Sequence, residues 1–428
     1  MKVLIVNTSE RTGGAAVAAR RLMEALKNNG VKAKMLVRDK TTENINVVQQ
    51  PNAFLRKWNF LRERLSIFLR NGFNREHLFD VSIANTGQDI TSLPEFDEAK
   101  VIHIHWTNQG MLSVKDIEKI LKSGKRVVWT MHDMWAFTGI CHYTGSCDKY
   151  KTECGQCPQI FSNRNKDLST KIFRKKKKAY EYSRITFVGC SNWIADKAKQ
   201  SQIVYNHRVV HIPNAINVNT FCMKSKYDSR IKLGLPVDKK LILFASMKVT
   251  DKRKGANHIV EACEIIRRKY SDKVEDIALV VFGKQSEELK AQIHLPVYSL
   301  PFISNEKEIA DIYCSADVFV IPSLQENLPN MVMESMSCGT PCVGFNVGGI
   351  PEMIDHLRNG YVAEYMSSQD IAEGIIWTMY NDNYEEISSS ARSKVLSTYS
   401  ESIVARQYID VYNSVGLRDV YDSRRTSF

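Results

Sequence analysis

The sequence predicts an α/β protein made of two Rossmann-like domains, and three observations carry that prediction. Short, fully apolar segments recur along the chain in alternation with helical patterns, which is typical of parallel sheets covered on both faces. A break rich in Pro and Asn, HIPNAINVNTF (211–221), separates two such series. With 428 residues, the chain is long enough for each series to bury its own core.

Composition and charge narrow the class of protein. Apolar residues make up 43% of the chain and charged residues 25%, as in soluble globular proteins. No window approaches the roughly 18 uninterrupted apolar residues of a membrane span, and Met1-Lys2 runs directly into VLIVN, so we expect neither a transmembrane nor a secreted protein. The net charge of +12 favours anionic partners such as nucleotides, nucleic acid or acidic lipid.

The N-terminal series is expected to form one domain, residues 1–212. It contains four apolar segments that indicate strands, 2–7, 101–106, 126–132 and 184–191, and a strand-like RVVHI (208–212) at its end. Gly13 and Gly14 follow the first of them and lead into an Ala-rich helix that ends at Gly30. Because the full G-x-G-x-x-G pattern is missing, a dinucleotide cofactor is disfavoured.

The C-terminal series is expected to form a second domain, residues 213–399, followed by a helix and tail, 400–428. Its strand signals are LILFAS (241–246), IALVVFG (277–283), VFVI (318–321), PCVGF (341–345) and YVAEY (361–365). Residues 317–355 carry two carboxylates in their middle, Glu326 in a loop and Glu334 on a helix predicted over 329–337. A loop that leads into a helix N-terminus presents free backbone N–H groups and is a natural seat for phosphate.

These motifs together resemble the family-4 retaining glycosyltransferases with the GT-B fold. The matching residues are the Glu326-x7-Glu334 pair, the GGIPE segment (348–352), the Lys254-Gly255 pair and the early Gly13-Gly14 loop, in the family's order along nearly the whole chain. The resemblance implies two Rossmann-like domains that face each other across a cleft. It is also consistent with a C-terminal helix that crosses back to the N-terminal domain.

The resemblance assigns the donor, a nucleotide-diphosphate sugar, mostly to the C-terminal domain. It implies that Glu334 accepts hydrogen bonds from the ribose, and that Glu326 contacts hydroxyls of the sugar near the reacting carbon. The simpler alternative for both is an ordinary surface glutamate. Asn327, Leu328 and Asn330 stand where the family often has Gly-Phe-Gly or Gly-Leu-Pro, so the loop after Glu326 leaves the sugar specificity open.

The same resemblance places Lys254 on the diphosphate, where a fixed cation stabilises the charge that develops on the leaving group. The family usually has an Arg about five residues earlier, but Val249 stands there. Arg253 is the first candidate for a second cation and Lys248 the second, and a solvated basic loop is the alternative. The chain has no Asp-x-Asp motif, so no metal or other cofactor is expected to be required for catalysis.

On the N-terminal side, His132 in WTMHD follows a predicted strand and resembles the family's histidine near the sugar and the acceptor. His103 and His105 alternate on the preceding strand and so share one face; buried structural histidines are the favoured interpretation. Gly13 and Gly14 would let the backbone approach the donor phosphates or the acceptor.

Four clustered cysteines lie in an insert, 138–160. Cys154 and Cys157 have the C-x2-C spacing of a zinc knuckle, and with Cys141 and Cys147 they could complete a structural zinc site. The first two are farther apart than is usual for such sites. Free thiols, a disulfide or an iron–sulfur cluster therefore stay open as alternatives.

The segment from Phe54 to Arg70 has an aromatic face opposite a basic one. Its apolar residues follow helical spacing: Phe54, Trp58, Leu61, Leu65 and Phe68. Arg56, Lys57, Arg62, Arg64 and Arg70 occupy the other face, against the single Glu63. Such a helix fits an anionic membrane interface, although a helix docked on the core by its apolar face is an equal alternative.

The expected function is transfer of a sugar from a nucleotide-diphosphate sugar to an acceptor hydroxyl with retention of configuration. The acceptor is expected to be a lipid-linked glycan intermediate of cell-surface polysaccharide synthesis, and the protein to be cytoplasmic, with peripheral contact to the inner face of the membrane. A nucleotide-sugar epimerase of the same fold is one rival. A basic nucleic-acid-binding protein is another, but it predicts aromatics interleaved with cations along a groove, so no nucleic-acid partner is expected.

Overall fold

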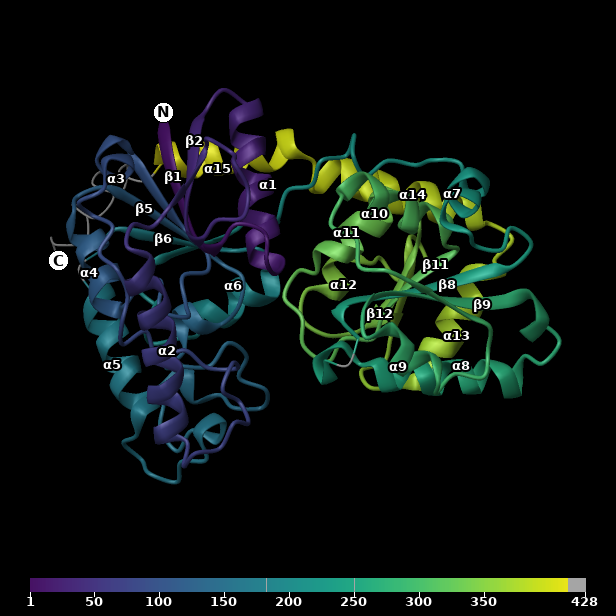
Figure 1. Cartoon of the computed structure of the whole chain (residues 1–428), viewed down its shortest axis with the longest axis horizontal. Coiled ribbons are helices and arrows are strands. Elements are labelled where there is room, and N and C mark those ends of the chain that lie inside the picture. The colour runs from purple at the N-terminus through teal and green to yellow at the C-terminus, as the bar shows by residue number, and fades with distance from the viewer. Residues whose placement is uncertain (182, 250, 415–428) are drawn as a thin grey trace, which may run out of the picture. The chain divides into compact units, whose positions relative to one another are not determined.

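The computed structural model describes residues 1–181, 183–249 and 251–414 (Figure 1). The chain divides into two compact units. Unit 1 comprises residues 1–215 together with the segment that begins at Val404, and unit 2 runs from Ile216 to Ile403. The predicted tail, 415–428, lies outside the described residues.

Unit 1 is built on a seven-stranded sheet in the order β3-β2-β1-β4-β5-β6-β7. All its neighbouring strands pair in parallel. The strands are β1 (Lys2–Ser9), β2 (Lys32–Asp39), β3 (Val47–Gln49), β4 (Val101–Ile104), β5 (Arg126–Met131), β6 (Ile185–Gly189) and β7 (Arg208–His211). Because the chain enters at β1 and winds outward in both directions, the carboxyl ends of β1 and β4 meet at the reversal of strand order, where ligands bind in such sheets.

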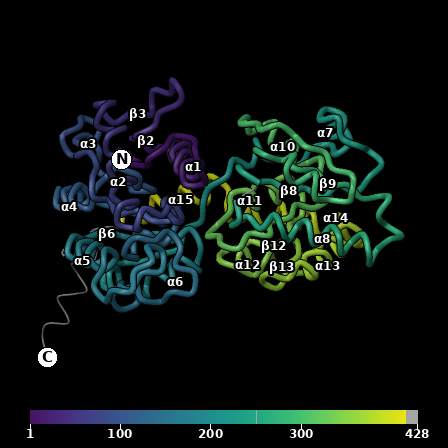
Figure 2. The backbone as a smooth tube through the Cα atoms, turned by 60° about the horizontal axis from the view of Figure 1, so that its bottom comes forward, coloured from purple at the N-terminus to yellow at the C-terminus, as the bar shows by residue number. Residues whose placement is uncertain are grey.

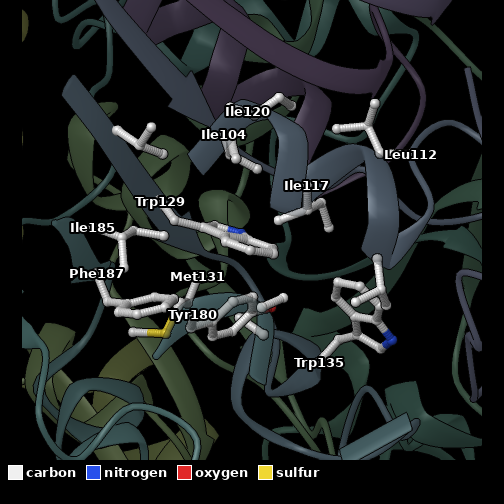
Figure 3. Packing of buried hydrophobic residues seen from close by; sticks show 14 of the residues in the cluster. Ile104, Leu112, Ile117, Ile120, Trp129, Met131, Trp135, Tyr180, Ile185 and Phe187 are labelled. Carbon is white, nitrogen blue, oxygen red and sulfur yellow. The ribbon is translucent and has the colours of Figure 1, made fainter. Parts of the chain in front are cut away.

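Helices cover both faces of this sheet. They are α1 (Gly14–Asn28), α2 (Ala53–Arg70), α3 (Pro94–Glu98), α4 (Val114–Lys122), α5 (Leu168–Tyr180) and α6 (Asn192–Lys199). Alternate residues of β1 enter opposite cores: Leu4 and Val6 pack in one cluster, Val3 and Ile5 in the other. Figure 3 shows the first cluster, with Trp129 close to Tyr180 and Phe187.

The last helix, α15 (Glu401–Ser414), returns the chain to unit 1 (Figures 1 and 2). Its apolar side joins the second core cluster through Val404, Ala405, Tyr408, Val411 and Tyr412. The Tyr412 hydroxyl hydrogen-bonds His103 Nδ1 at 2.7 Å, and the Tyr408 hydroxyl hydrogen-bonds Thr130 Oγ1 at 2.8 Å. The C-terminal helix is therefore part of the covering of the unit 1 sheet.

Unit 2 repeats the architecture with a six-stranded parallel sheet in the order β10-β9-β8-β11-β12-β13. The strands are β8 (Lys240–Lys248), β9 (Ile277–Lys284), β10 (Val297–Leu300), β11 (Val318–Ile321), β12 (Cys342–Phe345) and β13 (Gly360–Ala363). The helices are α7 (Lys226–Leu233), α8 (Ala256–Lys269), α9 (Ser286–Lys290), α10 (Glu306–Ser315), α11 (Asn330–Ser337), α12 (Ile350–Met353), α13 (Ser368–Met379) and α14 (Tyr384–Thr398). Here the reversal of strand order falls between β8 and β11.

Three strands, β2, β3 and β10, are absent from the sequence-based description. In β2 the lysines Lys32 and Lys34 break the apolar pattern, and β3 and β10 have only three and four residues. β3 and β10 lie at the edges of their sheets, where short and partly exposed strands are common. The strands that the sequence predicts are those with longer, mainly apolar runs.

Candidate active site

In unit 2, the loops that follow β8 and β11 bring Lys254 and Glu326 together. Lys254 ends a short 3₁₀ turn, Lys252–Lys254, and Glu326 lies between β11 and α11. The Lys254 ammonium group donates to Glu326 Oε1 and forms an ion pair with it. The Ser323 hydroxyl donates to the same oxygen at 3.2 Å. Two residues from separate motifs of the sequence thus meet at the carboxyl edge of the sheet.

Two glycines allow these loops to approach so closely. Gly255 has a φ of +68°, and a Cβ there would lie 1.8 Å from the carbonyl oxygen of Pro322. Gly348 has a φ of +59°, and its Cβ would lie 1.7 Å from the carbonyl oxygen of Glu326. Both distances are far below van der Waals contact, so each position requires glycine for space as well as for backbone conformation. The KG and GGIPE motifs therefore hold the Glu326 loop from both sides.

Glu334 lies on α11 and is buried. Its Oε2 accepts a hydrogen bond of 2.9 Å from the Tyr313 hydroxyl on α10. Burial, followed by the nearby Glu334 charge, raises the pKa of Tyr313 well above its ordinary value. Tyr313 therefore stays protonated and donates to the carboxylate.

The loop residues between the two glutamates face inward. Asn327 and Leu328 are buried and Asn330, the first residue of α11, is half-buried. Asn327 is linked to the GGIPE loop, because its carbonyl oxygen accepts from the Gly349 N–H at 2.8 Å. None of the residues from 327 to 330 adopts a positive φ, so the tight turn does not rely on the tolerance of asparagine for such angles; Gly348 supplies the positive φ opposite.

The candidates for a second cation differ in their surroundings. Arg253 is exposed, its guanidinium contacts Asp251 Oδ2 at 3.3 Å, and its carbonyl oxygen accepts from Leu324 N–H at 2.8 Å. Lys248 is exposed at the end of β8. Val249, where the family usually has an arginine, is buried in the unit 2 core, and this explains why no cation stands there.

In unit 1, the loops after β4 and β5 bring His105 and His132 into contact. Their rings stack, and His105 Nδ1 lies 2.8 Å from His132 Nε2. Burial lowers the pKa of His132 to about 4 and that of His105 well below its usual range, so both imidazoles are neutral near pH 7. His103 is buried and hydrogen-bonded on both ring nitrogens, to Tyr412 and Thr130, as expected of a structural histidine.

Asp133, next to His132, is the centre of a polar cluster that sequence reasoning missed. It accepts from Trp106 Nε1 at 2.8 Å, from Trp135 N–H at 2.8 Å and from His142 Nδ1 at 2.6 Å. Burial by itself would raise the pKa of Asp133, but His142 and these hydrogen bonds hold it below its ordinary value. The WTMHD segment contains both residues, but the sequence-based prediction included only His132 and not Asp133.

Gly13 and Gly14 lie where they were predicted, at the start of α1. Gly13 is the N-cap residue with a φ of +93°, a conformation that favours glycine, and Gly14 opens the helix. A Cβ at Gly13 would meet no atom within 4 Å. The backbone there is therefore open to the approach of another group.

The four clustered cysteines line one small cavity together with residues such as Ile140 and Tyr150. All four are free thiols, and burial raises the pKa of Cys154 to about 12 and that of Cys157 to about 11. Across residues 1–181, 183–249 and 251–414, no three His, Cys, Asp or Glu side chains are placed so that they could hold a metal ion. The geometry of the described residues gives the zinc expectation no support; Cys141, Cys154 and Cys157 are buried, and Cys147 is partly exposed.

Helix α2 packs against unit 1 through a mainly polar face, and not through the apolar face that its amphipathic sequence suggests. Asn59, Glu63, Arg64 and Ile67 are its buried residues. Glu63 accepts from the backbone N–H groups of Ile83 and Ala84, both at 2.8 Å, and pairs with Arg64 at 3.2 Å. The aromatic surface of α2, which comprises Phe54, Trp58, Leu61, Leu65 and Leu69, is exposed. The alternative of an apolar face docked on the core is therefore wrong, and Arg64 is not part of a solvated basic face.

Comparison with known proteins gives the family. Residues 12–220 match the description Glycosyltransferase Family 4, and residues 225–394 match Glycosyl transferases group 1. The chain belongs to this family of glycosyltransferases. Its fold is the family's GT-B fold.

Individual relatives of this chain are also named as glycosyltransferases. An uncharacterized glycosyltransferase of Methanocaldococcus jannaschii is 27% identical over 368 residues, which cover 78% of this chain and 89% of that protein. A protein of Escherichia coli K12 named as a colanic acid biosynthesis glycosyl transferase, WcaC, is 23% identical over 338 residues, or 74% of this chain and 76% of that one.

Solved structures share the fold of the glycosyltransferase at low sequence identity. Sucrose-phosphate synthase from Thermosynechococcus elongatus superimposes with a TM-score of 0.69 and 17% identity, covering 97% of this chain and 99% of that chain. Anabaena HepE, solved in complex with UDP-glucose, gives a TM-score of 0.63 with 15% identity and covers 97% of this chain and 100% of that one. In the described part of the glycosyltransferase, no helix is both long and apolar enough to cross a membrane.

Proposed function

We propose that this glycosyltransferase moves a sugar from a nucleoside-diphosphate donor to an acceptor hydroxyl with retention of configuration. One observation carries the proposal: Lys254 and Glu326 meet at the carboxyl edge of the unit 2 sheet, beside the helix that carries Glu334. A cation for the diphosphate, a carboxylate for the sugar and a carboxylate for the ribose are the groups that such a donor needs. The complex of the fold relative HepE with UDP-glucose supports the same class of donor.

In the proposed reaction, Lys254 leaves its ion pair with Glu326 and binds the donor diphosphate. The bond between the anomeric carbon and the diphosphate oxygen breaks, and the cation stabilises the charge that gathers on this oxygen. The acceptor oxygen then bonds to the anomeric carbon on the same face, and its proton passes to the departing phosphate oxygen. Glu326, released from Lys254, accepts hydrogen bonds from the sugar hydroxyls, and no protein nucleophile is required.

We infer that the acceptor is lipid-linked and is presented at an anionic membrane surface. The exposed aromatic surface of α2 supports this, because Phe54 and Trp58 are 73% and 52% exposed, an unusual state for large apolar side chains in a protein that binds only small molecules. Phe73, Phe79 and Phe161 add further exposed rings in the segments that follow α2 and directly after the cysteine-rich insert. Lys57, Arg62 and Arg70 are exposed on the same helix and would meet acidic headgroups.

The names of the relatives support a role in polysaccharide synthesis. The WcaC protein is named for colanic acid biosynthesis, and a second relative, from Erwinia amylovora, is named for amylovoran biosynthesis. These names and the family favour transfer over epimerisation. The rivalry with a nucleic-acid-binding protein is weakened further, since the exposed rings of α2 gather on one helix face instead of lining a groove with cations.

The test begins with donor binding. The wild-type protein is screened by thermal unfolding against UDP-, GDP- and dTDP-sugars, because a ligand that binds only the folded protein raises its melting temperature. The stabilising donor is then incubated with a lipid-linked acceptor, and the anomeric configuration of the product is read by NMR. We expect a glycoside with the donor's configuration. Isomerised nucleotide sugar in the absence of acceptor would instead identify an epimerase.

A further inference from the structure

His105, which contacts His132, has one ring nitrogen that plays no part in the proposed reaction. His105 Nδ1 contacts His132, but His105 Nε2 is buried and receives no hydrogen bond from any described residue. Two more buried atoms share that condition: Thr107 Oγ1 and Asn108 Oδ1. A buried polar atom without a hydrogen-bond partner destabilises the folded protein, so three of them in four residues of sequence require an explanation.

All three residues line one cavity of about 10 Å³. Its other walls are mostly aromatic and apolar, and they include Trp129, Met131 and Trp135, which are labelled in Figure 3. His132 lines the cavity as well. A space of about this size holds one water molecule when two to four polar partners surround it, and here there are three.

We propose that this cavity is the site of a bound water molecule, which completes a hydrogen-bond chain from Cys190 through His132 and His105 and so helps to fix the tautomer of His132. His105 is then a positioning residue for His132. The geometry gives the order of the hydrogen bonds, beginning at the opposite side of the His132 ring.

Cys190 gives the first step of that order. Its Sγ lies 3.0 Å from the carbonyl oxygen of Met131, to which the thiol donates. The sulfur's lone pairs then face His132 Nδ1 at 3.8 Å, so the hydrogen of the neutral His132 ring belongs on Nδ1. His132 Nε2 is consequently an acceptor, and His105 Nδ1 must be the donor in the bond of 2.8 Å.

The remaining bonds follow from the chemistry of the cavity. A neutral His105 with its hydrogen on Nδ1 has a lone pair on Nε2, which accepts one hydrogen of the water. Asn108 Oδ1 can only accept, and it takes the other hydrogen. The Thr107 hydroxyl donates to the water oxygen. Every polar atom in the cavity is then satisfied, and the depressed pKa values of both histidines agree with a chain of neutral rings.

The consequence for the site is that His132 is held in one neutral tautomer, with Nδ1–H directed at Cys190 Sγ and Nε2 accepting from His105. A ring fixed in this way does not change charge during the reaction. This catalytic consequence rests on the proposed role of His132 in sugar transfer. The bound water and the tautomer do not rest on it.

The first test uses the wild-type protein with ¹⁵N-labelled histidine. Two-bond ¹H–¹⁵N correlation spectra distinguish a protonated ring nitrogen from an unprotonated one. We expect His132 to be protonated on Nδ1 alone between about pH 5 and 8. An experimental crystal structure should show one water within hydrogen-bond distance of His105 Nε2, Thr107 Oγ1 and Asn108 Oδ1. A His132 ring protonated on Nε2, or a dry cavity, would overturn the proposal.

The second test separates positioning from folding. The amide of His105→Asn can take the place of Nδ1–H, whereas His105→Phe fills the space without a donor. We expect His105→Asn to keep the His132 tautomer and most of kcat, and His105→Phe to mix the tautomers and lower kcat about tenfold, with a smaller change in KM. Equal kcat and unchanged His132 signals in both variants would also overturn the proposal. Because the tautomer is read without substrate, this result stays distinct from a failure of the proposed reaction.

Discussion

Lys254 and Glu326 form an ion pair between the loops after two neighbouring strands, 72 residues apart in the sequence. Their side chains are 27% and 12% exposed, so the pair is partly shielded from water. A donor diphosphate would compete with Glu326 for the lysine. Binding of the donor and release of the carboxylate are therefore expected to be coupled.

This coupling predicts opposite effects on nucleotide binding from the two partners. Glu326→Gln should lower the rate of transfer by about a hundredfold or more, yet bind the nucleoside diphosphate at least as tightly as wild type, because Lys254 is released. Lys254→Met should lower both transfer and nucleotide affinity. Isothermal titration with the nucleoside diphosphate and initial rates of glycoside formation measure the two quantities.

Lys269→Met is the matched control, since Lys269 is exposed on α8 and pairs with Glu373 at 3.5 Å in the same unit. It should change neither quantity. Weaker nucleotide binding by Glu326→Gln would contradict the proposed exchange of partners.

Gly255→Ala should damage the donor site through a steric clash. The new Cβ would lie 1.8 Å from the Pro322 carbonyl oxygen, so the loops that carry Lys254 and Glu326 must separate. Gly234 provides the control, because its φ of +65° is close to the +68° of Gly255 but a Cβ there meets nothing within 4 Å. Gly234→Ala should cost only about 1–2 kcal/mol of backbone strain. Thermal unfolding and transfer rates compare the two, and equal losses in both variants would argue against the clash.

Much of this fold follows from local pattern. The runs Val3–Val6 and Val318–Ile321 are apolar throughout, which is typical of central strands in covered parallel sheets. The contact between Lys254 and Glu326 could not be predicted in the same way. It depends on β8 and β11 being neighbours, which is a property of the strand order and not of either loop.

Helix α2 shows a different limit. Periodicity indicates which residues share a face, but not which face is buried. Glu63 is inside because two backbone N–H groups, of Ile83 and Ala84, receive its carboxylate, and nothing in the helix sequence reveals those partners. Tyr313 escaped notice for the same reason, since its role depends on the packing of α10 against α11.

Tyr313→Phe should weaken nucleotide binding more than it slows the reaction. The Tyr313 hydroxyl donates to Glu334, and its loss leaves a buried carboxylate with one donor fewer. Because a hydrogen bond to a charged group contributes about 1.5–3 kcal/mol, we expect the dissociation constant of the nucleotide to rise about tenfold or more. Tyr408→Phe removes a buried hydroxyl bonded to Thr130 in unit 1 and should leave nucleotide affinity as it is. Titration calorimetry would contradict the role of Tyr313 if both variants bound equally well.

Lys176 should make stability depend on pH. It is fully buried in α5, donates to the carbonyl oxygens of Trp135 and Thr138, and burial lowers its pKa to about 7. Between about pH 7 and the ordinary lysine pKa near 10.5, the unfolded chain binds a proton at this residue that the folded protein does not, so the contribution of Lys176 to the free energy of unfolding should rise with pH. Below pH 7 both states are protonated and this contribution is constant.

Lys176→Met should flatten that rise, which is on the order of a few kcal/mol at about 1.4 kcal/mol per pKa unit. Urea unfolding of both proteins at several pH values from about 6 to 10 measures it. Lys177→Met, in the same helix, is the control, because Lys177 is exposed. The same pH dependence of the unfolding free energy in the wild type and in Lys176→Met would contradict the prediction.

The aromatic surface of α2 should be separable from the fold of the helix. Since α2 is held by Asn59, Glu63, Arg64 and Ile67, serine at Phe54, Trp58 and Leu61 leaves those contacts in place. Each large apolar side chain contributes about 1.5–3 kcal/mol when it leaves water, so the triple variant should bind anionic vesicles at least a hundredfold more weakly. Tyr227→Ser with Ile231→Ser is the control, because these residues are 61% and 59% exposed on α7 of unit 2. Flotation with phosphatidylglycerol vesicles at low and high salt reports the binding, which should weaken with salt as the cations of α2 are screened. Undiminished flotation of the triple variant would show that this surface does not meet the membrane.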